Sequence, residues 1–349
     1  MNEMLGDETI SSWVERHLFY ASLGGENQIF RGMREYLDSR TNSDADYYTD
    51  QDFGRLVSTL PCIPRDLSLH RTPMTSFMLI PSLERINFCP ACVKDDLKTK
   101  KTAIWREQWA FGWYVICVKH QCALCSLGTE YRCGSTKYRA ENACRFLIEN
   151  RYISSESHLE NECHFSSELS SYRPAGALVN EINGLAFIMQ ARIQLLITYK
   201  PSIANAELTL IYDLMKVMLR SHVRRIEAPP FCYQLVKKIT GRNFSIPRQF
   251  SGDASVALLG VAQVIEPYPR LLAMALSAFL LELPGSQARW LRASKLFAEM
   301  GMLVPGEKKL LYTALAGPSE FGIKSWFSKR TLVYPIELRG LCRKFCLDS

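Results

Sequence analysis

The sequence lacks an apolar run long enough to cross a membrane. Its longest apolar runs cover residues 256–265 and 271–281, and each is shorter than the roughly 20 residues that a membrane-spanning helix needs. We interpret both runs as buried core helices. A secretion signal is lacking too, because the first residues, MNEMLGDETISSW, are acidic and polar. We therefore expect a cytoplasmic protein with no membrane partner.

The sequence also lacks the motifs of several common enzyme classes. It contains no hydrolase nucleophile elbow, protein-kinase set or zinc-protease helix. The stretch GPSEFGIKS at residues 317–325 resembles a phosphate-binding loop, but Ile323 separates the second glycine from Lys324 and Pro318 removes a backbone donor. A plain turn is the better interpretation. A nuclease with acidic residues scattered along the chain is the remaining enzymatic alternative, and we expect no enzyme.

The chain is rich in cysteine, with 12 among 349 residues, and carries a net charge of +7. This length suffices for two or three domains that bury their own cores, so disulfides are not needed for stability. In a cytoplasmic protein, clustered cysteines are more often metal ligands than disulfides. The mild positive charge is compatible with a nucleic-acid partner but does not establish one.

Two pairs of metal-binding residue types stand 24 residues apart. Cys89-x-x-Cys92 and Cys117-x-x-His120 have the spacing of the two knuckles of a zinc ribbon. Three cysteines and one histidine complete a tetrahedral structural site that leaves no position for water. Two alternatives are cysteines that are simply buried and a catalytic Cys117 with His120 as its base. The repeated spacing favours zinc.

A second group of cysteines follows the first. It consists of Cys122, Cys125, Cys133 and Cys144, with His158, Cys163 and His164 further along. These residues supply enough ligands for a second zinc, but they do not form two clean knuckles. The alternative interpretation is that several of these thiols pack in the core of a small module.

Hydrophobic periodicity predicts helices on both sides of the cysteine-rich region. Apolar residues that include Trp13 recur at helical spacing at residues 10–18, and the same period returns at residues 29–37 and 53–60. Three short helices indicate a helix-turn-helix-like unit. Helical patterns resume after residue 177. The predicted fold is mainly α, with an N-terminal helical part (1–80), a zinc module (81–165) and a C-terminal helical domain (166–349).

One stretch of the C-terminal half is strongly basic. It contains Lys216, Arg220, Arg224, Arg225, Lys237, Lys238, Arg242 and Arg248. These side chains could neutralise the phosphates of a nucleic acid or contact a partner, although a solvated helix face is the alternative. The pattern at residues 291–303, with a further short helix after Gly306, indicates a second helix-turn-helix.

The order of these motifs resembles one protein family. The stretch DETISSWVER at residues 7–16 resembles the N-terminal motif of the TniQ family, which also includes the TnsD target selectors. FCPAC at residues 88–92 and the tryptophan-containing stretch that leads to CVKHQCAL at residues 117–124 resemble the zinc region of the same family. The second cysteine ribbon is less regular than in many members, and the chain is shorter than the long TnsD selectors.

This resemblance implies a bacterial, non-catalytic adaptor that selects target sites for a transposon. TniQ proteins of CRISPR-associated transposons are similar in size to this chain, form homodimers and dock on a guide-RNA Cascade complex close to the target DNA. They then recruit an AAA+ regulator and, through it, the transposase. The resemblance therefore implies RNA-guided transposition with these partners. The alternative is a direct, sequence-specific DNA-binding selector of the TnsD type.

Overall fold

The structure is a computed structural model, and it describes the chain in separate segments. These are residues 7–9, 12, 13, 16, 77–81, 84–100, 102–127, 139–149, 173–199, 204–221, 229–241, 244, 246, 258, 264, 266–317 and 322–346. The predicted helices at residues 29–37 and 53–60 lie outside them. The described chain is mainly helical, as predicted, and it divides into two compact units, Met1–Phe111 with Ser126–Ser157 and Gly112–Cys125 with His158–Ser349. The predicted three-part division stays a prediction.

The first unit combines short strands with two helices. Strand β1 (Asn87–Phe88) is paired with β4 (Cys125–Ser126), helix α4 (Pro90–Lys100) follows β1, and a 3-10 helix, η4, covers Glu107–Ala110. Helix α5 (Arg139–Glu149) packs on α4.

Aromatic rings fill the core of the first unit. The rings of Trp105 and Trp109 meet edge to face at 5.2 Å, and Phe88 contacts both of them and the edge of Phe146. Trp13 is also buried there. Aromatic contacts of this kind stabilise the fold in addition to the hydrophobic gain from burial. The first unit therefore has a packed core although it contains few helices.

The second unit begins with a β-hairpin and continues as a helical domain. Strands β2 (Ile116–Cys117) and β3 (Cys122–Ala123) are antiparallel, with Ile116 opposite Ala123 and Cys117 opposite Cys122. The helices are α6 (Arg173–Tyr199), α7 (Ala204–Met218), α8 (Phe231–Thr240), α10 (Pro267–Leu280), α11 (Ser286–Glu299), α12 (Lys308–Ala316), α13 (Ile323–Thr331) and α14 (Ile336–Arg343).

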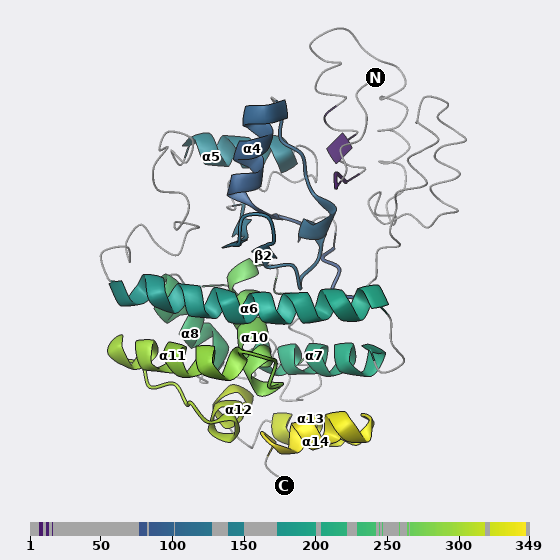
Figure 1. The fold of residues 1–349 in the computed structure, drawn as a ribbon, viewed down its shortest axis with the longest axis vertical. Coiled ribbons are helices and arrows are strands. Elements are labelled where there is room, and N and C mark those ends of the chain that lie inside the picture. Colours follow the sequence, from purple (N-terminus) through teal and green to yellow (C-terminus); the bar gives the residue numbers. More distant parts are fainter. Residues whose placement is uncertain are drawn as a thin grey trace, which may run out of the picture. The chain divides into compact units, whose positions relative to one another are not determined.

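Helix α10 is the centre of the helical domain. Every residue of this helix is buried, and it packs against α6, α7 and α8. The sequence predicted this, because residues 271–281 are apolar around the whole helix. Figure 1 shows α6 and α11 running side by side, and Trp290 of α11 stacks on Phe279 of α10 at 5.4 Å.

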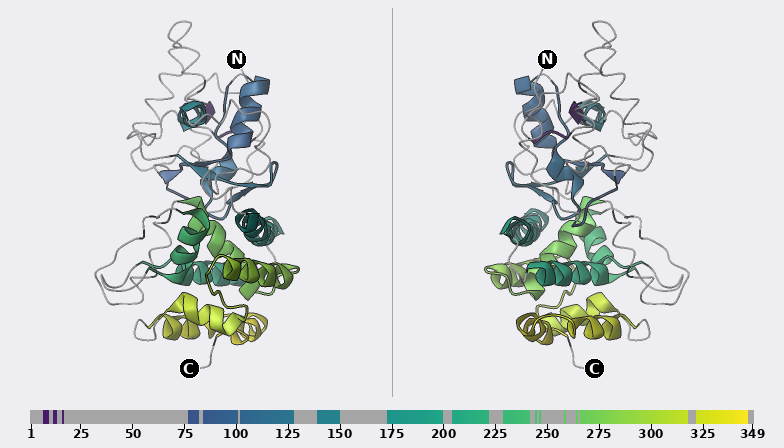
Figure 2. Two further views of the ribbon diagram at one scale, coloured as in Figure 1. Left: turned by 90° about the vertical axis from the view of Figure 1, so that its left-hand side faces the viewer. Right: turned by 90° about the vertical axis from the view of Figure 1, so that its right-hand side faces the viewer.

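Helices α12, α13 and α14 lie together at one end of the second unit (Figures 1 and 2). The rings of Tyr312, Phe327 and Phe345 meet at centroid distances of 5.5–6.2 Å. Gly322, whose φ is 66°, immediately precedes α13 in a conformation that favours glycine. In the part of the chain that the structure describes, no helix has the length and the apolar content that crossing a membrane would require.

Candidate metal centre

The first knuckle forms where a strand runs into a helix. Cys89 follows β1, Pro90 is the first residue of α4, and Cys92 lies in the first turn. Proline suits this position because its fixed φ is helical and the first amide of a helix has no intrahelical acceptor. The backbone N–H of Cys92 points to the Sγ of Cys89 at 3.4 Å. Free amides at a helix N-terminus stabilise a thiolate, which is the form that binds metal.

The second knuckle is the turn of the β2–β3 hairpin. Cys117 ends β2, and the N–H of Gln121 donates to the carbonyl oxygen of Cys117 at 2.7 Å, which closes the turn. Gln121 has a positive φ of 51°, so the chain reverses within four residues. The ring nitrogen Nδ1 of His120 then lies 3.5 Å from the Sγ of Cys117.

The two knuckles bring their four side chains together. The ligand atoms of Cys89, Cys92, Cys117 and His120 all lie within 4.8 Å of one another. The three cysteines are buried and the histidine is partly exposed. Ligands about 2.0–2.3 Å from a tetrahedral zinc lie roughly 3.5–3.8 Å apart, so the cluster fits such an ion after small shifts. Three sulfurs and an imidazole are a donor set that suits zinc.

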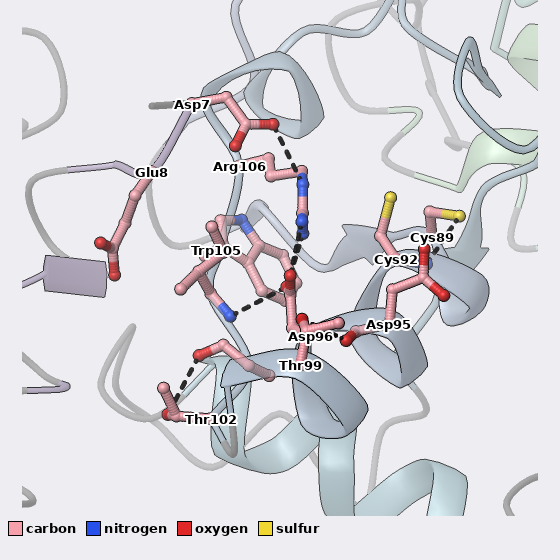
Figure 3. A network of polar contacts seen from close by, with 12 residues as sticks. Asp7, Glu8, Cys89, Cys92, Asp95, Asp96, Thr99, Thr102, Trp105 and Arg106 are labelled. Carbon is pink, nitrogen blue, oxygen red and sulfur yellow. Dashed lines mark hydrogen bonds and ion pairs between the residues drawn. The ribbon is translucent and has the colours of Figure 1, made fainter. Parts of the chain in front are cut away.

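A buried ion-pair network adjoins the first knuckle (Figure 3). The guanidinium of Arg106 donates to both carboxylate oxygens of Asp96 at 2.8 and 2.9 Å, and it also contacts Asp7 at 3.0 Å. Burial opposes the charge of Arg106, but the bonds to Asp96 and the nearby Cys92 and Asp7 outweigh it and raise the pKa of this group above its ordinary value. This paired charge ties α4 to the segment that carries Trp105 and Trp109.

The N-terminal motif residues fold onto the same tryptophan-containing segment. Glu8 is fully buried and accepts hydrogen bonds from Arg16, at 2.7 and 3.0 Å, and from Ser12. The hydroxyl of Ser12 accepts the backbone N–H of Trp105 at 2.8 Å, and the N–H of Thr9 donates to the carbonyl of Trp105 at 2.9 Å. The acid, serine and arginine of DETISSWVER are therefore structural.

The described members of the second cysteine set do not form a metal-binding cluster. Cys122 lies in β3, Cys125 in β4 and Cys144 in α5, and among the described residues the first cluster is the only group of three or more potential ligands. Burial raises the pKa of Cys144 to about 11, which opposes the thiolate form. Cys133, together with His158, Cys163 and His164, lies outside the described residues, so a second zinc stays a prediction.

The described side chains of the basic stretch do not form one exposed basic surface. Lys216 forms an ion pair with Asp213 at 3.0 Å and lies over the ring of Tyr212. Arg220 is only 2% exposed, so it is not available to a partner at the surface. Lys237 and Lys238, at the end of α8, are exposed. The other members, Arg224, Arg225, Arg242 and Arg248, lie outside the described residues.

Sequence reasoning missed two elements that hold the metal centre in place. One is the Asp96–Arg106 pair, and the other is Gln190 of α6, which hydrogen-bonds to the backbone of β2. Neither follows a local spacing rule, because their partners are 10 and about 75 residues away. The stretch between the two knuckles, which carries Arg106, resembles the zinc region of the TniQ family, but this resemblance does not indicate the ion pair with Asp96.

Comparison with known proteins gives one match. No curated protein and no solved structure matches the chain. Residues 3–124 match the model of the family described as TniQ. The matched range contains the N-terminal Glu8–Arg16 motif, the tryptophan-containing segment and all four residues of the metal cluster. Residues 3–124 of the chain are therefore similar to a TniQ domain.

Proposed function

We propose that this protein is a non-catalytic adaptor in RNA-guided transposition. In this role it would bind a Cascade-type guide-RNA complex as a homodimer in the bacterial cytoplasm, near the target DNA. It would pass the position of the target site to an AAA+ regulator and a transposase. The TniQ domain associates the chain with target-site selection, and the finer steps are our inference.

The observation that carries the proposal is the position of the metal cluster inside the TniQ match. All four ligands fall within residues 3–124. Four protein ligands fill a tetrahedral zinc and leave no site for water or substrate, which is the arrangement of a structural metal. A zinc of this kind would hold the two knuckles together and would supply no Lewis acid to a reaction. This supports a role in binding rather than in catalysis.

The distribution of positive charge favours the adaptor over a direct DNA-binding selector. A sequence-specific DNA-binding protein needs a group of exposed basic side chains that follow the phosphate backbone. In the described part of the basic stretch, Lys216 is paired with Asp213 and Arg220 is buried. Only Lys237 and Lys238 are exposed there. In the described part of residues 216–248, direct DNA reading is therefore the weaker proposal.

Affinity purification of the tagged full-length protein from its native host, with sequencing of the co-purified RNA and DNA, tests the proposal. We expect one short, repeat-derived guide RNA at near-stoichiometric amounts. The paired variant Lys237→Glu/Lys238→Glu is the control, because an adaptor should retain the RNA when these two charges are reversed. Recovery of one defined DNA sequence without guide RNA, and loss of that DNA in the control variant, would show a direct selector instead.

A further inference from the structure

Three large aliphatic side chains within five residues of one another are exposed where α13 ends and α14 begins. Leu332 is 67% exposed, Val333 68% and Ile336 75%. Leu332 and Val333 lie in the turn after α13, and Ile336 is the first residue of α14. Single exposed aliphatic residues are common on protein surfaces, but a contiguous group indicates an interaction site.

The exposed face of helix α14 presents a second unusual feature. Leu338 and Cys342 face the core, whereas Ile336, Gly340 and Arg343 are spaced by four and three residues along the exposed face. A Cβ added at Gly340 would meet nothing within 4 Å. Packing within the chain therefore does not require glycine here, although glycine weakens a helix interior by roughly 1 kcal/mol relative to alanine. Glycine on an exposed face lets the backbone of a partner approach closely.

The basic residues around this apolar group differ in whether they form ion pairs. Arg330 is paired with Asp213 and Lys344 with Glu282. Lys329 and Arg343, which flank the apolar group along the chain, are exposed and form no ion pair with a described residue. Arg339 adds a third positive charge, with its Nε bonded to the carbonyl of Tyr334. One exposed acid, Glu337, lies at the edge of the face.

We propose that this surface, formed by Lys329, Leu332, Val333, Ile336, Gly340 and Arg343, binds an acidic amphipathic helix of a partner protein. The aliphatic group would receive the apolar side chains of that helix, as in other helix-binding surfaces. Lys329 and Arg343 would meet carboxylates beside them, since complementary charges set the orientation and the rate of association. The proposal rests on the geometry of α13 and α14, and it does not depend on which target device the protein uses.

A nucleic acid fits this face less well. In a helix-turn-helix the residues at the start of the second helix reach the bases or phosphates and need polar donors. Here that position holds Ile336, with two aliphatic residues before it and the carboxylate of Glu337 after it. A second copy of the same face fits no better, because it would bring Lys329 and Arg343 against their own like charges.

Two hydrogen bonds connect this surface to α7. The hydroxyl of Tyr334, which lies inside the turn, donates to Asp213 of α7 at 2.6 Å, and Arg330 donates to the same carboxylate oxygen at 2.9 Å. Asp213 is fully buried. A partner would therefore bind a preformed surface and would not have to order it, which favours affinity.

Fluorescence anisotropy with the full-length protein and a labelled synthetic helix tests this proposal. The probe is a 20-residue peptide with leucines on one helical face and glutamates on the other, compared with the same peptide carrying lysines in place of glutamates. We expect the glutamate peptide to bind at least about tenfold more tightly than the lysine peptide, a difference of about 1.4 kcal/mol. Ile336→Ser and the pair Lys329→Glu/Arg343→Glu should each weaken binding of the glutamate peptide by a similar factor.

Two matched variants separate this surface from general hydrophobic or electrostatic binding. Leu195→Ser removes an exposed leucine from α6, and Lys237→Glu reverses an exposed lysine on α8, and both should leave the affinity unchanged. Thermal melts followed by circular dichroism show that each variant is folded. Equal binding of the two peptides, or equal effects of the control variants, would overturn the proposal. It would also be overturned if Ile336→Ser abolished binding of a 20-base-pair DNA duplex, or turned a dimer into a monomer in sedimentation.

Discussion

Gln190 of α6 and Ile116 of β2 are joined by hydrogen bonds in both directions. The side-chain Oε1 of Gln190 accepts the backbone N–H of Ile116 at 3.0 Å, and its Nε2 donates to the carbonyl oxygen of Ile116 at 2.8 Å. The same Oε1 accepts the N–H of Val115 at 2.9 Å. Gln190 is 1% exposed. A core helix thus completes the backbone hydrogen bonding of the strand that ends at the metal ligand Cys117.

Replacing this glutamine should destabilise the protein. Gln190→Leu keeps the side-chain volume but leaves two backbone N–H groups and one carbonyl buried without partners, and each such group costs about 1–3 kcal/mol. We expect the free energy of unfolding, measured by urea denaturation, to fall by at least about 3 kcal/mol. The control is Gln194→Leu on the exposed face of the same helix. Equal effects of the two substitutions would show that the bonds to β2 contribute little.

The metal cluster predicts a link between zinc content and folding. Cys89→Ser and His120→Ala each remove one of four ligands, and structural zinc contributes about 10 kcal/mol or more to the folding of small zinc modules. We expect both variants to lose zinc, as measured by inductively coupled plasma mass spectrometry of the purified protein. A chelator should lower the melting temperature of the unchanged protein.

Cys122→Ser is the matched control for these two variants. Cys122 stands opposite Cys117 in the β2–β3 register but is not part of the four-residue cluster. The zinc of the cluster should therefore remain in Cys122→Ser. Full zinc content in Cys89→Ser or His120→Ala would show that the ligand assignment is wrong. A second zinc per chain in the unchanged protein, lost in Cys122→Ser, would support the second cysteine set.

Features that depend on local spacing could be predicted from the sequence. The two knuckle spacings predicted that Cys89, Cys92, Cys117 and His120 converge, and the structure brings these atoms together. The continuous apolar run predicted the buried α10. Within each knuckle and along α10 the relevant geometry is set within a few residues by a turn or a helical period.

Features that depend on distant partners could not be predicted. Lys216 and Arg220 look alike in a basic stretch. The pairing of Lys216 with Asp213, three residues earlier, follows helical spacing, but the burial of Arg220 follows from no local pattern. Asp213 itself meets Arg330, 117 residues later in the chain. The sequence shows which residues carry charge, but only the tertiary fold decides which charges pair and which remain at the surface.

The buried pair Glu8–Arg16 should behave as one unit. Glu8 is fully buried and Arg16 nearly so, and they are joined by two hydrogen bonds. Removing one member of a buried pair leaves an uncompensated charge, which costs about 3–5 kcal/mol. We expect Glu8→Gln and Arg16→Met each to lower the unfolding free energy by about that amount. The double variant should lose clearly less than the sum. Strict additivity in this double-mutant cycle would contradict a direct coupling between the two side chains.

The lowered pKa of Glu181 in α6 predicts that the folded protein loses stability in acid. The hydrogen bond from Arg292, together with the charges of Arg292 and Arg289, lowers the pKa of Glu181 although burial opposes this. A lowered pKa means that the folded protein favours the carboxylate, so its contribution is complete above the ordinary value of about 4.3 and is lost as the pH falls through the folded pKa. Urea denaturation between pH 6 and pH 3.5 should therefore show a smaller acid-induced loss of unfolding free energy in Glu181→Gln than in the unchanged protein.

Arg292→Gln should also reduce this acid-induced loss, because it removes the largest cause of the lowered pKa of Glu181. Identical pH profiles for all three proteins would mean that the link between α6 and α11 does not depend on this charge.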